Sequence, residues 1–371
     1  MKKAMNGMDA AVEALRQIDP EVVAAYPITP STGIPEGYSN LIKDGKVSGE
    51  LINVESEHSA LSACVGAAAS GVRTMTVTSS QGLAYMWEVL GITSGLRLPV
   101  LMFIGNRALS APINIHCDHS DTMGARDQGW LQIYCENAQE VYDLSFIGLK
   151  LAEKVKLPIM ICQDGFITTH TVEPVVIHDD KKIKEFLGEY KAEKNLLKEP
   201  TTLGYFAMPN SYFEFKEEQE KAMKNALEEY DKISEEYPYK KYSPIASYKT
   251  KDADYVIVVM SSTSGLVKDV VDELREKNIK VGVIKIRLFR PFPYKNIKEV
   301  LKNAKSVAVL DRSMSFGAFP PLFSEIKNCF DGKMQSYIYG LGGRDIFKKN
   351  IIEVFRKLEE EDYNEEGRLI K

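Results

Sequence analysis

The chain has 371 residues, of which 44% are hydrophobic and 27% are charged, and its formal net charge is −5. This length predicts two or three domains, and the acidic balance speaks against nucleic acid or an anionic membrane surface as a partner. No apolar stretch approaches the ~20 residues of a membrane span, and the basic start Met1–Met5 lacks the apolar core of a signal peptide, which leaves the cytoplasm as the expected location.

Strand and helix patterns alternate along residues 1–175. Helices are predicted for residues 7–18, 57–70, 81–94 and 138–155, and strands for residues 21–26, 51–54, 74–78, 99–104 and 157–162. The strand at 99–104 is continuously apolar, which is typical of a parallel strand covered on both faces. This alternation predicts an α/β fold with a parallel sheet.

The second half of the chain begins with a change in composition. Residues 179–248 contain runs of Lys and Glu, which predict a connecting segment with one long surface helix. A second α/β unit follows, with strands at 254–260, 280–285 and 306–311 and a helix that ends at 277. We therefore expect a first domain with its connecting segment at 1–235, a second α/β domain at 250–357 and a charged tail at 358–371.

The five cysteines are scattered and form no Cys-x-x-Cys pair: Cys64, Cys117, Cys135, Cys162 and Cys329. Cys64 and Cys162 lie in apolar runs and are most simply small core residues. A disulfide framework, a zinc site or an iron–sulfur cluster held by this chain alone is therefore not expected.

Polar residues follow four of the predicted strands in the first half of the chain. Thr29, Glu57, Ser80 and Arg107 each come just after a strand. In parallel α/β sheets, ligands bind at the carboxyl ends of the strands. We therefore expect these four residues to share one site.

Glu57 stands where an apolar strand runs into a helix rich in Ala and Gly. A carboxylate backed by small residues suits the protonation of a flat heterocycle held against the backbone. Glu55 competes for this role, and a helix N-cap at Ser56 with both acids in the first turn is the alternative explanation.

Thr29 and Arg107 are candidates for holding a small carboxylate substrate. Thr29 lies between Pro27 and Pro30, so its backbone has little freedom, although a simple proline-rich turn is the alternative. The guanidinium of Arg107 can hold a carboxylate with two parallel hydrogen bonds, although a surface ion pair is the commoner role for a single arginine.

Three further segments have compositions that could serve a ligand, a metal ion or an anion. Ser80-Gln81-Gly82 predicts a turn into a helix with its amide donors facing outward, which fits close approach to a ligand or, equally, helix capping. Residues 114–121 contain His, Cys and Asp, but they are too close together to converge on one ion unless a further ligand arrives from elsewhere, so we predict no metal site. Residues 340–345 are glycine-rich, which fits an anion cradle or, more simply, a turn.

Four strings closely resemble the α chain of 2-oxoacid:ferredoxin oxidoreductases, pyruvate:ferredoxin oxidoreductase above all: Tyr26–Thr32, Asn53–Ala60, Ser79–Leu83 and Gly105–Leu109. The resemblance covers residues 1–350. It implies a parallel-sheet α/β domain of the pyrimidine-binding type that binds thiamine diphosphate. A second α/β domain would follow that is similar to the C-terminal domain of transketolase and serves assembly.

The resemblance also implies roles for individual residues. Glu57 maps onto the glutamate that shares a proton with N1′ of the aminopyrimidine ring, while the cofactor performs the carbanion chemistry. Thr29 would lie beside the oxoacid and Arg107 would clamp its carboxylate. The expected catalytic residues are thus Glu57, Thr29 and Arg107, and the expected cofactor contacts are Glu57, Pro27, Ile28, Ser80 and Gln81.

Partner subunits are implied because this chain lacks a Gly-Asp-Gly segment for the diphosphate and magnesium; Gln163-Asp164-Gly165 comes nearest but lacks the first glycine. A β subunit would hold the diphosphate and magnesium. A γ subunit and a small ferredoxin-like δ subunit, separate or fused, would join it, and the 4Fe-4S clusters would also sit on partner subunits. External ferredoxin would accept the electrons, and coenzyme A would be the co-substrate.

The expected reaction is the oxidative decarboxylation of pyruvate to acetyl-CoA and CO2. The alternatives are the same chemistry on 2-oxoisovalerate, 2-oxoglutarate or an aryl 2-oxoacid, and a non-catalytic scaffold subunit of such a complex.

Overall fold

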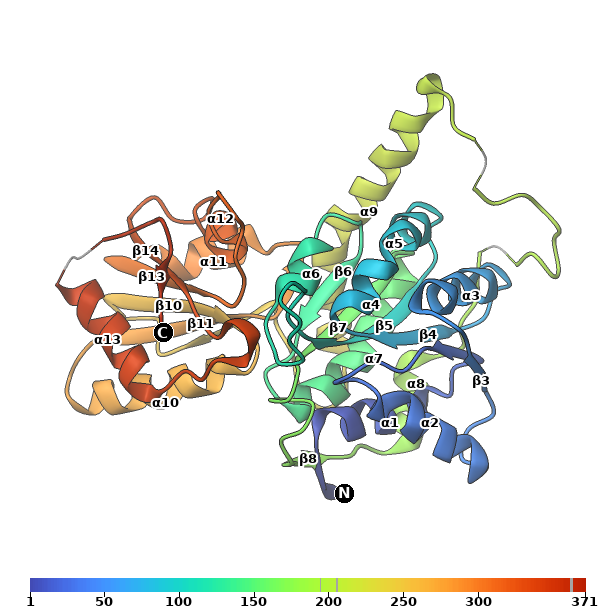
Figure 1. Ribbon diagram of the computed structural model, residues 1–371, viewed down its shortest axis with the longest axis horizontal. Helices are drawn as coiled ribbons and strands as arrows, with labels where there is room; N and C mark the ends of the chain where they lie inside the picture. Colours follow the sequence, from blue (N-terminus) through green and yellow to red (C-terminus); the bar gives the residue numbers. More distant parts are fainter. Residues whose placement is uncertain (194, 205, 361–362) are drawn as a thin grey trace.

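The computed structural model describes residues 1–193, 195–204, 206–360 and 363–371. These residues form two lobes that lie side by side, each built on its own large β-sheet (Figure 1). The first lobe contains the described residues up to 236 and the strand at Leu288–Arg290. The second lobe contains the other described residues from 245 onward.

The sheet of the first lobe has seven strands in the order β12-β6-β7-β5-β4-β2-β3. All neighbours are parallel except β12, which pairs antiparallel with β6. The strands are β2 (Val22–Ala25), β3 (Glu50–Asn53), β4 (Thr74–Thr78), β5 (Val100–Asn106), β6 (Leu131–Tyr134), β7 (Ile159–Asp164) and β12 (Leu288–Arg290).

Helices cover both faces of this sheet. Along β5, Leu101 and Phe103 point into the core shared with α1, α2, α7, α8 and α9, whereas Met102 and Ile104 point into the core shared with α3, α4 and α5. The two layers explain why β5 is apolar on both faces. The helices are α1 (Gly7–Ile18), α2 (Gly33–Lys43), α3 (Glu57–Ala69), α4 (Ser80–Tyr85), α5 (Trp87–Gly95), α7 (Ala138–Val155), α8 (Asp180–Leu187) and α9 (Pro209–Glu236).

The sheet of the second lobe has six strands in the order β15-β14-β13-β10-β11-β9, with only β9 antiparallel. Its strands are β9 (Ile245–Tyr248), β10 (Tyr255–Met260), β11 (Val281–Ile286), β13 (Ser306–Asp311), β14 (Lys333–Ile338) and β15 (Arg368–Leu369). Helices α10 (Thr263–Glu276) and α13 (Lys348–Glu359) pack on one face, and α11 (Tyr294–Leu301) and α12 (Pro321–Ile326) on the other.

The two lobes share a hydrophobic core. One cluster of buried side chains includes Met160 and Cys162 of the first sheet together with Val258 and Ile284 of the second. Since β12 lies within the sequence of the second lobe but completes the first sheet, it also ties the lobes together. The contacts between the lobes described below therefore rest on a packed interface.

Shorter elements complete the described chain. Strands β1 (Lys2–Met5) and β8 (Glu173–Val176) form a separate antiparallel pair, α6 (Ser120–Gly124) follows the long loop after β5, and η1 (Leu341–Gly343) follows β14. Helix α9 extends away from the body of the first lobe (Figure 1). Among the helices of the described residues, none has both the length and the apolar character that crossing a bilayer requires.

Many predicted elements are confirmed. The predicted bounds of the helices at 7–18 and 138–155 and of the strand at 74–78 agree with α1, α7 and β4. The predicted helix at 81–94 is wrong as a single element, because the chain divides at Met86 into α4 and α5. The sequence did not reveal the short strands β6, β9 and β12, whose three or four residues carry little periodicity.

Candidate active site at the carboxyl ends of the first sheet

The four polar loops meet at one edge of the first sheet. They follow β2, β3, β4 and β5, which are parallel and adjacent in the order β5-β4-β2-β3. Parallel strands end on the same side, so the loops that follow them are neighbours. The prediction that Thr29, Glu57, Ser80 and Arg107 lie after strands at one edge is confirmed.

Glu57 is the first residue of α3, and only 8% of it is exposed. Within the described residues, no group donates a hydrogen bond to its carboxylate or forms an ion pair with it. Its side chain lies against Gly82, where an added Cβ would come within 2.7 Å of Glu57 Oε1. The side chain is largely buried while its carboxylate oxygens have no protein partner, an arrangement typical of a group kept for a ligand.

The competing acid, Glu55, has a different environment. Glu55 is exposed and accepts a hydrogen bond of 2.5 Å from the Ser59 hydroxyl, which lowers the pKa of its carboxyl. The expected N-cap is also present, because the Ser56 hydroxyl accepts from the Ser59 amide at 3.2 Å. The cap and the buried acid thus coexist, and burial distinguishes Glu57 from Glu55.

The loop after β2 is held by packing and hydrogen bonds. Ser31 Oγ lies 3.0 Å from Ser79 Oγ, which joins this loop to the one after β4. Pro30 packs against Gly165, where an added Cβ would come within 2.8 Å of Pro30 Cγ. Thr29 and Pro27 are exposed on the outer side of the loop. The Thr29 hydroxyl therefore stands at the surface of the site on an anchored backbone.

Arg107 crosses from the loop after β5 to the loop after β2. Its Nη1 donates to the carbonyl oxygen of Thr29 at 3.1 Å and its Nε to that of Asn114 at 2.9 Å. Only 7% of Arg107 is exposed, and burial lowers the pKa of its guanidinium, while the charge of Asp121 opposes that shift. The alternative of a surface ion pair is wrong, because the residue is buried.

Asp121 was not singled out from the sequence, yet it joins two of the loops. Its Oδ2 accepts the backbone N–H groups of Ser80 at 3.1 Å and of Arg107 at 3.0 Å. Its Oδ1 accepts from Asn106 Nδ2 at 2.9 Å and from the Thr122 amide at 2.7 Å. Burial raises the pKa of this carboxyl to about 6, against the effect of these hydrogen bonds. In the sequence, the only feature that pointed to Asp121 was its place in the His-, Cys- and Asp-containing segment at residues 114–121.

The Ser80 contacts correct one prediction. We expected outward-facing amides at Ser80-Gln81-Gly82, but the Ser80 amide points inward to Asp121 and the Gly82 amide donates to Ser79 O at 2.9 Å. The Ser80 hydroxyl lies 2.6 Å from Ala108 O. A buried acceptor beneath the turn explains the difference, because a buried N–H needs a partner.

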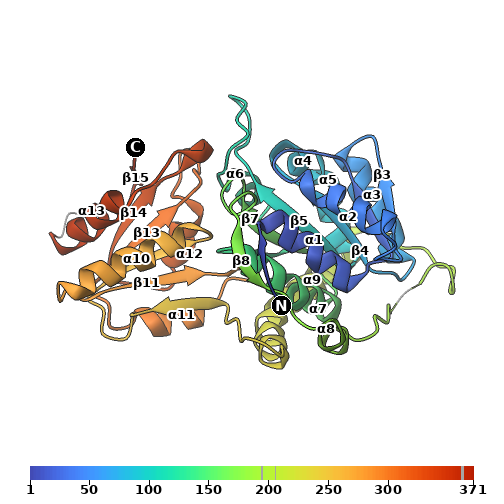
Figure 2. The ribbon, with the colours of Figure 1, turned by 90° about the horizontal axis from the view of Figure 1, so that it is seen from below.

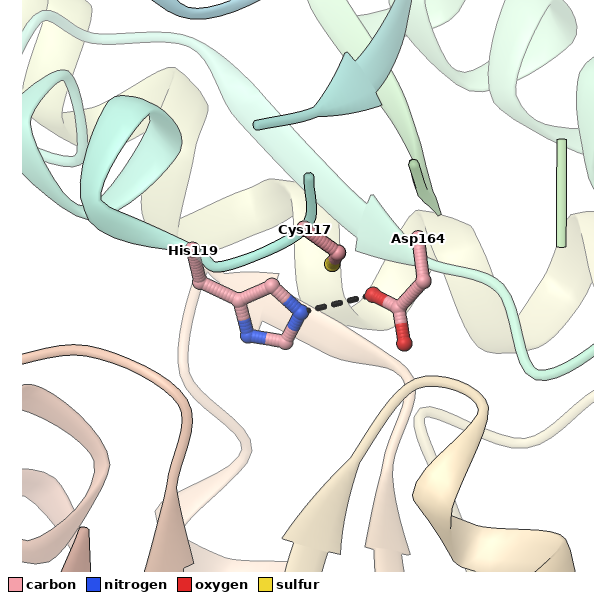
Figure 3. Close-up of side chains that lie close together, drawn as sticks. All are labelled: Cys117, His119 and Asp164. Atoms are coloured by element: carbon pink, nitrogen blue, oxygen red, sulfur yellow. Dashed lines mark hydrogen bonds and ion pairs between the residues drawn. The ribbon is translucent and has the colours of Figure 1, made fainter. Parts of the chain in front are cut away.

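Cys117, His119 and Asp164 form a buried cluster at the junction of the lobes (Figure 3). His119 Nε2 lies 2.8 Å from Asp164 Oδ1, and the possible ligand atoms of all three lie within 4.8 Å of one another. Asp164, from the end of β7, is the further ligand whose need the sequence indicated. The geometry alone would therefore admit a metal ion.

The charges around this cluster do not suit a cation. Arg312 Nη1 lies 2.9 Å from Asp164 Oδ2, which also accepts from the Ser262 hydroxyl. Burial disfavours the charged form of Asp164, but His119 and Arg312 outweigh that effect and hold the pKa of this carboxyl below its usual range. Burial raises the pKa of the Cys117 thiol well above its ordinary value. The guanidinium occupies the position of the positive charge, so the cluster is best described as an ion pair between the lobes.

Both parts of the chain match one known family. Residues 13–235 match the family described as pyruvate flavodoxin/ferredoxin oxidoreductase, thiamine diphosphate-binding, and residues 253–351 match core domain II of pyruvate:ferredoxin oxidoreductase. The chain belongs to the pyruvate:ferredoxin oxidoreductase family.

Named relatives of this family cover nearly the whole chain. The pyruvate synthase subunit PorA of Thermotoga maritima is 48% identical over 364 residues, which are 95% of this chain and 93% of that protein. The ketoisovalerate oxidoreductase subunit VorA of Pyrococcus furiosus is 41% identical over 362 residues, covering 95% of this chain and 92% of that protein.

Solved structures share the fold. A 2-oxoglutarate:ferredoxin oxidoreductase from Magnetococcus marinus superposes with a TM-score of 0.79 at 19% identity; the match covers 96% of this chain and 65% of that one. A split-gene transketolase gives a TM-score of 0.58 at 11% identity, with 96% and 98% covered. At these identities only the fold is shared, and it agrees with the parallel α/β, transketolase-like architecture predicted from the sequence.

The residues of this family member fit one half of thiamine diphosphate. The Glu57 carboxylate lies without a partner among the described residues, and because Gly82 has no side chain the carboxylate can lie close to the backbone of α4. The hydroxyl of Thr78, which also lies against Gly82, is fully buried and without a partner within the described chain. These groups suit a polar heterocycle. Asp164 of the segment nearest to Gly-Asp-Gly is bonded to His119 and Arg312, which does not suit a diphosphate with magnesium.

Proposed function

We propose that this chain is the α subunit of a thiamine diphosphate-dependent pyruvate:ferredoxin oxidoreductase that is active only with a partner subunit. The reaction would convert pyruvate and coenzyme A to acetyl-CoA and CO2 with reduction of ferredoxin. The observation that carries this proposal is the carboxylate of the largely buried Glu57, which has no partner within the described chain and lies at the sheet edge where Thr29 and Arg107 also gather.

Glu57 would hold a proton at N1′ of the aminopyrimidine ring. Bound thiamine diphosphate supplies the electron sink for the decarboxylation. Pro27, Ile28 and Gln81 would contact the cofactor from the loops after β2 and β4. Ser80, the fourth contact expected from the sequence, is fully buried, with its amide bonded to Asp121 and its hydroxyl to Ala108 O, so it would support the turn instead. Gln81 is half-buried, and its Oε1 lies 2.6 Å from the Ser80 hydroxyl, so its side chain has a defined position.

Arg107 would hold the carboxylate of the oxoacid. Its Nε and Nη1 each donate to a carbonyl oxygen, and within the described residues no hydrogen bond is formed by Nη2. A guanidinium has five N–H donors, so the Nη1–Nη2 edge keeps enough donors for a bidentate carboxylate. The exposed Thr29 hydroxyl on the anchored loop would add a hydrogen bond to the same substrate.

The remaining components would be supplied by partners. A β subunit would carry the diphosphate and magnesium site, and a γ subunit and a ferredoxin-like δ subunit would join it, with 4Fe-4S clusters on partner subunits. Two features support this division: Asp164 is committed within this chain, and all five cysteines are buried and scattered. We also propose that the complex lies in the cytoplasm, as expected from the sequence.

Pyruvate is proposed as the substrate because a relative at 48% identity is named a pyruvate synthase subunit. 2-Oxoisovalerate is the second candidate, favoured by the ketoisovalerate oxidoreductase relative at 41% identity. Arg107 and Thr29 recognise what all 2-oxoacids share, so they do not discriminate. The test is kcat/KM of the assembled complex for pyruvate, 2-oxoisovalerate, 2-oxoglutarate and an aryl 2-oxoacid. Pyruvate ranking below another acid would overturn the choice.

The variant Glu57→Gln, measured in the assembled complex, tests whether this chain is catalytic or a non-catalytic scaffold. We expect turnover to fall by about 10²- to 10⁴-fold, the usual contribution of a positioned acid–base group. Glu55→Gln is the matched control, because Glu55 is two residues away and exposed. Equal turnover in the two variants would favour the scaffold.

A further inference from the structure

The glycine-rich segment after β14 of the second lobe contacts the loop that carries Arg107. Gly342 O accepts from Asn114 Nδ2 at 3.1 Å, and the Gly343 amide donates to Cys117 O at 2.7 Å. The Gly342 amide also donates to Asp118 Oδ2 at 3.2 Å. Figure 2 shows the first lobe's loop region around α6 on the side that faces the second lobe. The segment is thus a turn that forms hydrogen bonds with residues 114–118 of the first lobe.

The contact requires glycine at both positions. Gly342 and Gly343 have φ values of +59° and +82°, which residues with a side chain rarely adopt. An added Cβ at Gly342 would come within 2.6 Å of Asn114 Nδ2, and one at Gly343 would overlap the Cβ of His116. The turn therefore lies against the loop without room for a side chain.

The loop at residues 114–118 also forms a hydrogen bond with Arg107. Asn114 connects the two contacts. Its side-chain Nδ2 donates to Gly342 O of the second lobe, and its main-chain carbonyl oxygen accepts from Arg107 Nε at 2.9 Å. The Ala108 amide donates to His116 O at 3.0 Å, which closes the loop at its base. Asn114 is half-buried, so both contacts lie at the rim of the site.

We propose that Asn114 and the Gly342–Gly343 turn of the second lobe are positioning elements that set the orientation of the Arg107 guanidinium toward the oxoacid. This role builds on the proposed function, in which Arg107 binds the substrate carboxylate. The second lobe then contributes to substrate binding, beyond the assembly role expected from the sequence. The physical reason is that a guanidinium on a long side chain holds a carboxylate well only when its plane is fixed.

The experiment compares variants of the assembled complex by KM for pyruvate, kcat, and binding of oxamate, an unreactive carboxylate analogue. Asn114→Ala removes the side chain that links the lobes, and Gly342→Ala inserts a Cβ into the contact. Gly317→Ala is the matched control: Gly317 lies in the same lobe at a φ of +78°, with nothing within 4 Å of an added Cβ. It shares the backbone strain of Gly342→Ala but not the contact.

We expect Asn114→Ala and Gly342→Ala each to raise KM and to weaken oxamate binding by about tenfold, with kcat changed less than about threefold. Thiamine diphosphate affinity stays at the wild-type value, because Glu57 and Gly82 are not touched. Gly317→Ala leaves KM and oxamate binding unchanged. Asn114→Ala adds little in an Arg107→Ala background, because both changes act through one group.

Arg107→Ala distinguishes substrate binding by Arg107 from the positioning of Arg107 by Asn114 and the Gly342–Gly343 turn. If it leaves KM and oxamate binding unchanged, the proposed function of Arg107 is overturned together with this inference. If it weakens both while Asn114→Ala and Gly342→Ala behave like Gly317→Ala, only the positioning role is overturned. Full additivity of Asn114→Ala with Arg107→Ala would also overturn it. Should Gly342→Ala fail to assemble, Asn114→Ala decides, since it only removes atoms from a half-buried side chain.

Discussion

The guanidinium of Arg107 donates from Nη1 to the carbonyl oxygen of Thr29 at 3.1 Å. This bond joins the loops after β5 and β2, which are separated in the sheet by β4. The two residues proposed to hold the oxoacid are therefore already fixed relative to each other within this chain. A site prepared in this way loses less free energy when the substrate is ordered.

Gly82→Ala is expected to weaken thiamine diphosphate binding and turnover in the assembled complex, each by at least about tenfold. The reason is steric: the new Cβ would lie 2.7 Å from Glu57 Oε1, in space that the carboxylate needs. Equilibrium binding of thiamine diphosphate and kcat measure the effect.

Gly66→Ala is its control on the neighbouring helix. Gly66 lies in α3, the helix that begins with Glu57, and an added Cβ there meets nothing within 4 Å. We expect this change to stabilise the chain by about 0.5–1 kcal/mol and to leave cofactor binding unchanged. Wild-type cofactor affinity in Gly82→Ala would contradict the placement of the site.

The Asp121 carboxyl predicts a pH dependence of activity. Its pKa is raised to about 6, so it gains a proton as the pH falls through that value and loses the charge that accepts from Ser80 and Arg107. We expect kcat/KM to fall below about pH 6 in the wild type. The folded chain binds this proton more tightly than the unfolded chain does, so the contribution of Asp121 to the free energy of unfolding falls as the pH rises from about 4 to about 6.

Asp121→Asn removes the titration. We expect a lower kcat/KM at neutral pH, because an amide has one acceptor oxygen where the carboxylate has two, and two buried N–H groups lose their partner. The fall in kcat/KM near pH 6 should also disappear. The exposed Asp127 serves as control through Asp127→Asn. An unchanged pH profile in Asp121→Asn would assign the acid limb to another group.

Arg312→Leu is expected to destabilise the chain by about 3–5 kcal/mol, since it leaves the Asp164 carboxylate buried and without its guanidinium partner. Urea unfolding of the full chain measures the change in free energy of unfolding.

The double variant Asp164→Asn with Arg312→Leu should recover much of that loss, because no uncompensated charge remains. Added Zn²⁺ should leave the Tm of the wild type unchanged, since Arg312 occupies the position that a cation would need. A Tm that rises with stoichiometric Zn²⁺ would show that Cys117, His119 and Asp164 bind metal.

Asp311 predicts a pH dependence of stability in the second lobe. It is buried at the end of β13 and accepts the amides of Leu322 at 2.7 Å and Phe323 at 3.1 Å, and burial raises the pKa of its carboxyl to about 7. The folded state therefore holds this proton up to a higher pH than the unfolded state. Its contribution to the free energy of unfolding falls, by on the order of 3 kcal/mol, as the pH rises from about 4 to about 7.

The measurement is urea unfolding of the wild type and Asp311→Asn at several pH values between 5 and 8. We expect the wild type to lose stability relative to the variant as the pH rises through this range. Parallel pH dependence in the two chains would mean that Asp311 does not titrate there.

Much of the fold was determined by local sequence. Helices α1 and α7 follow from apolar periodicity with an Asn at each N-cap, and β4 and β5 follow from apolar or alternating runs. The alternation of strands with helices also predicted that the loops holding Thr29, Glu57, Ser80 and Arg107 share one edge. These features depend on neighbours in the chain, so the sequence alone expresses them.

Only the tertiary structure decided which buried polar groups meet. Glu57 and Glu55 look alike in sequence, and only packing buries one of them against Gly82. Asp164 meets Arg312 across 148 residues, and Asn114 meets Gly342 across 228. Such pairs depend on which strand ends and lobes lie side by side, and three-residue elements such as β12 carry too little periodicity to predict that. The placement of the candidate residues after parallel strands was therefore readable from the chain, whereas the contacts that hold them in position come from the packing of the two lobes.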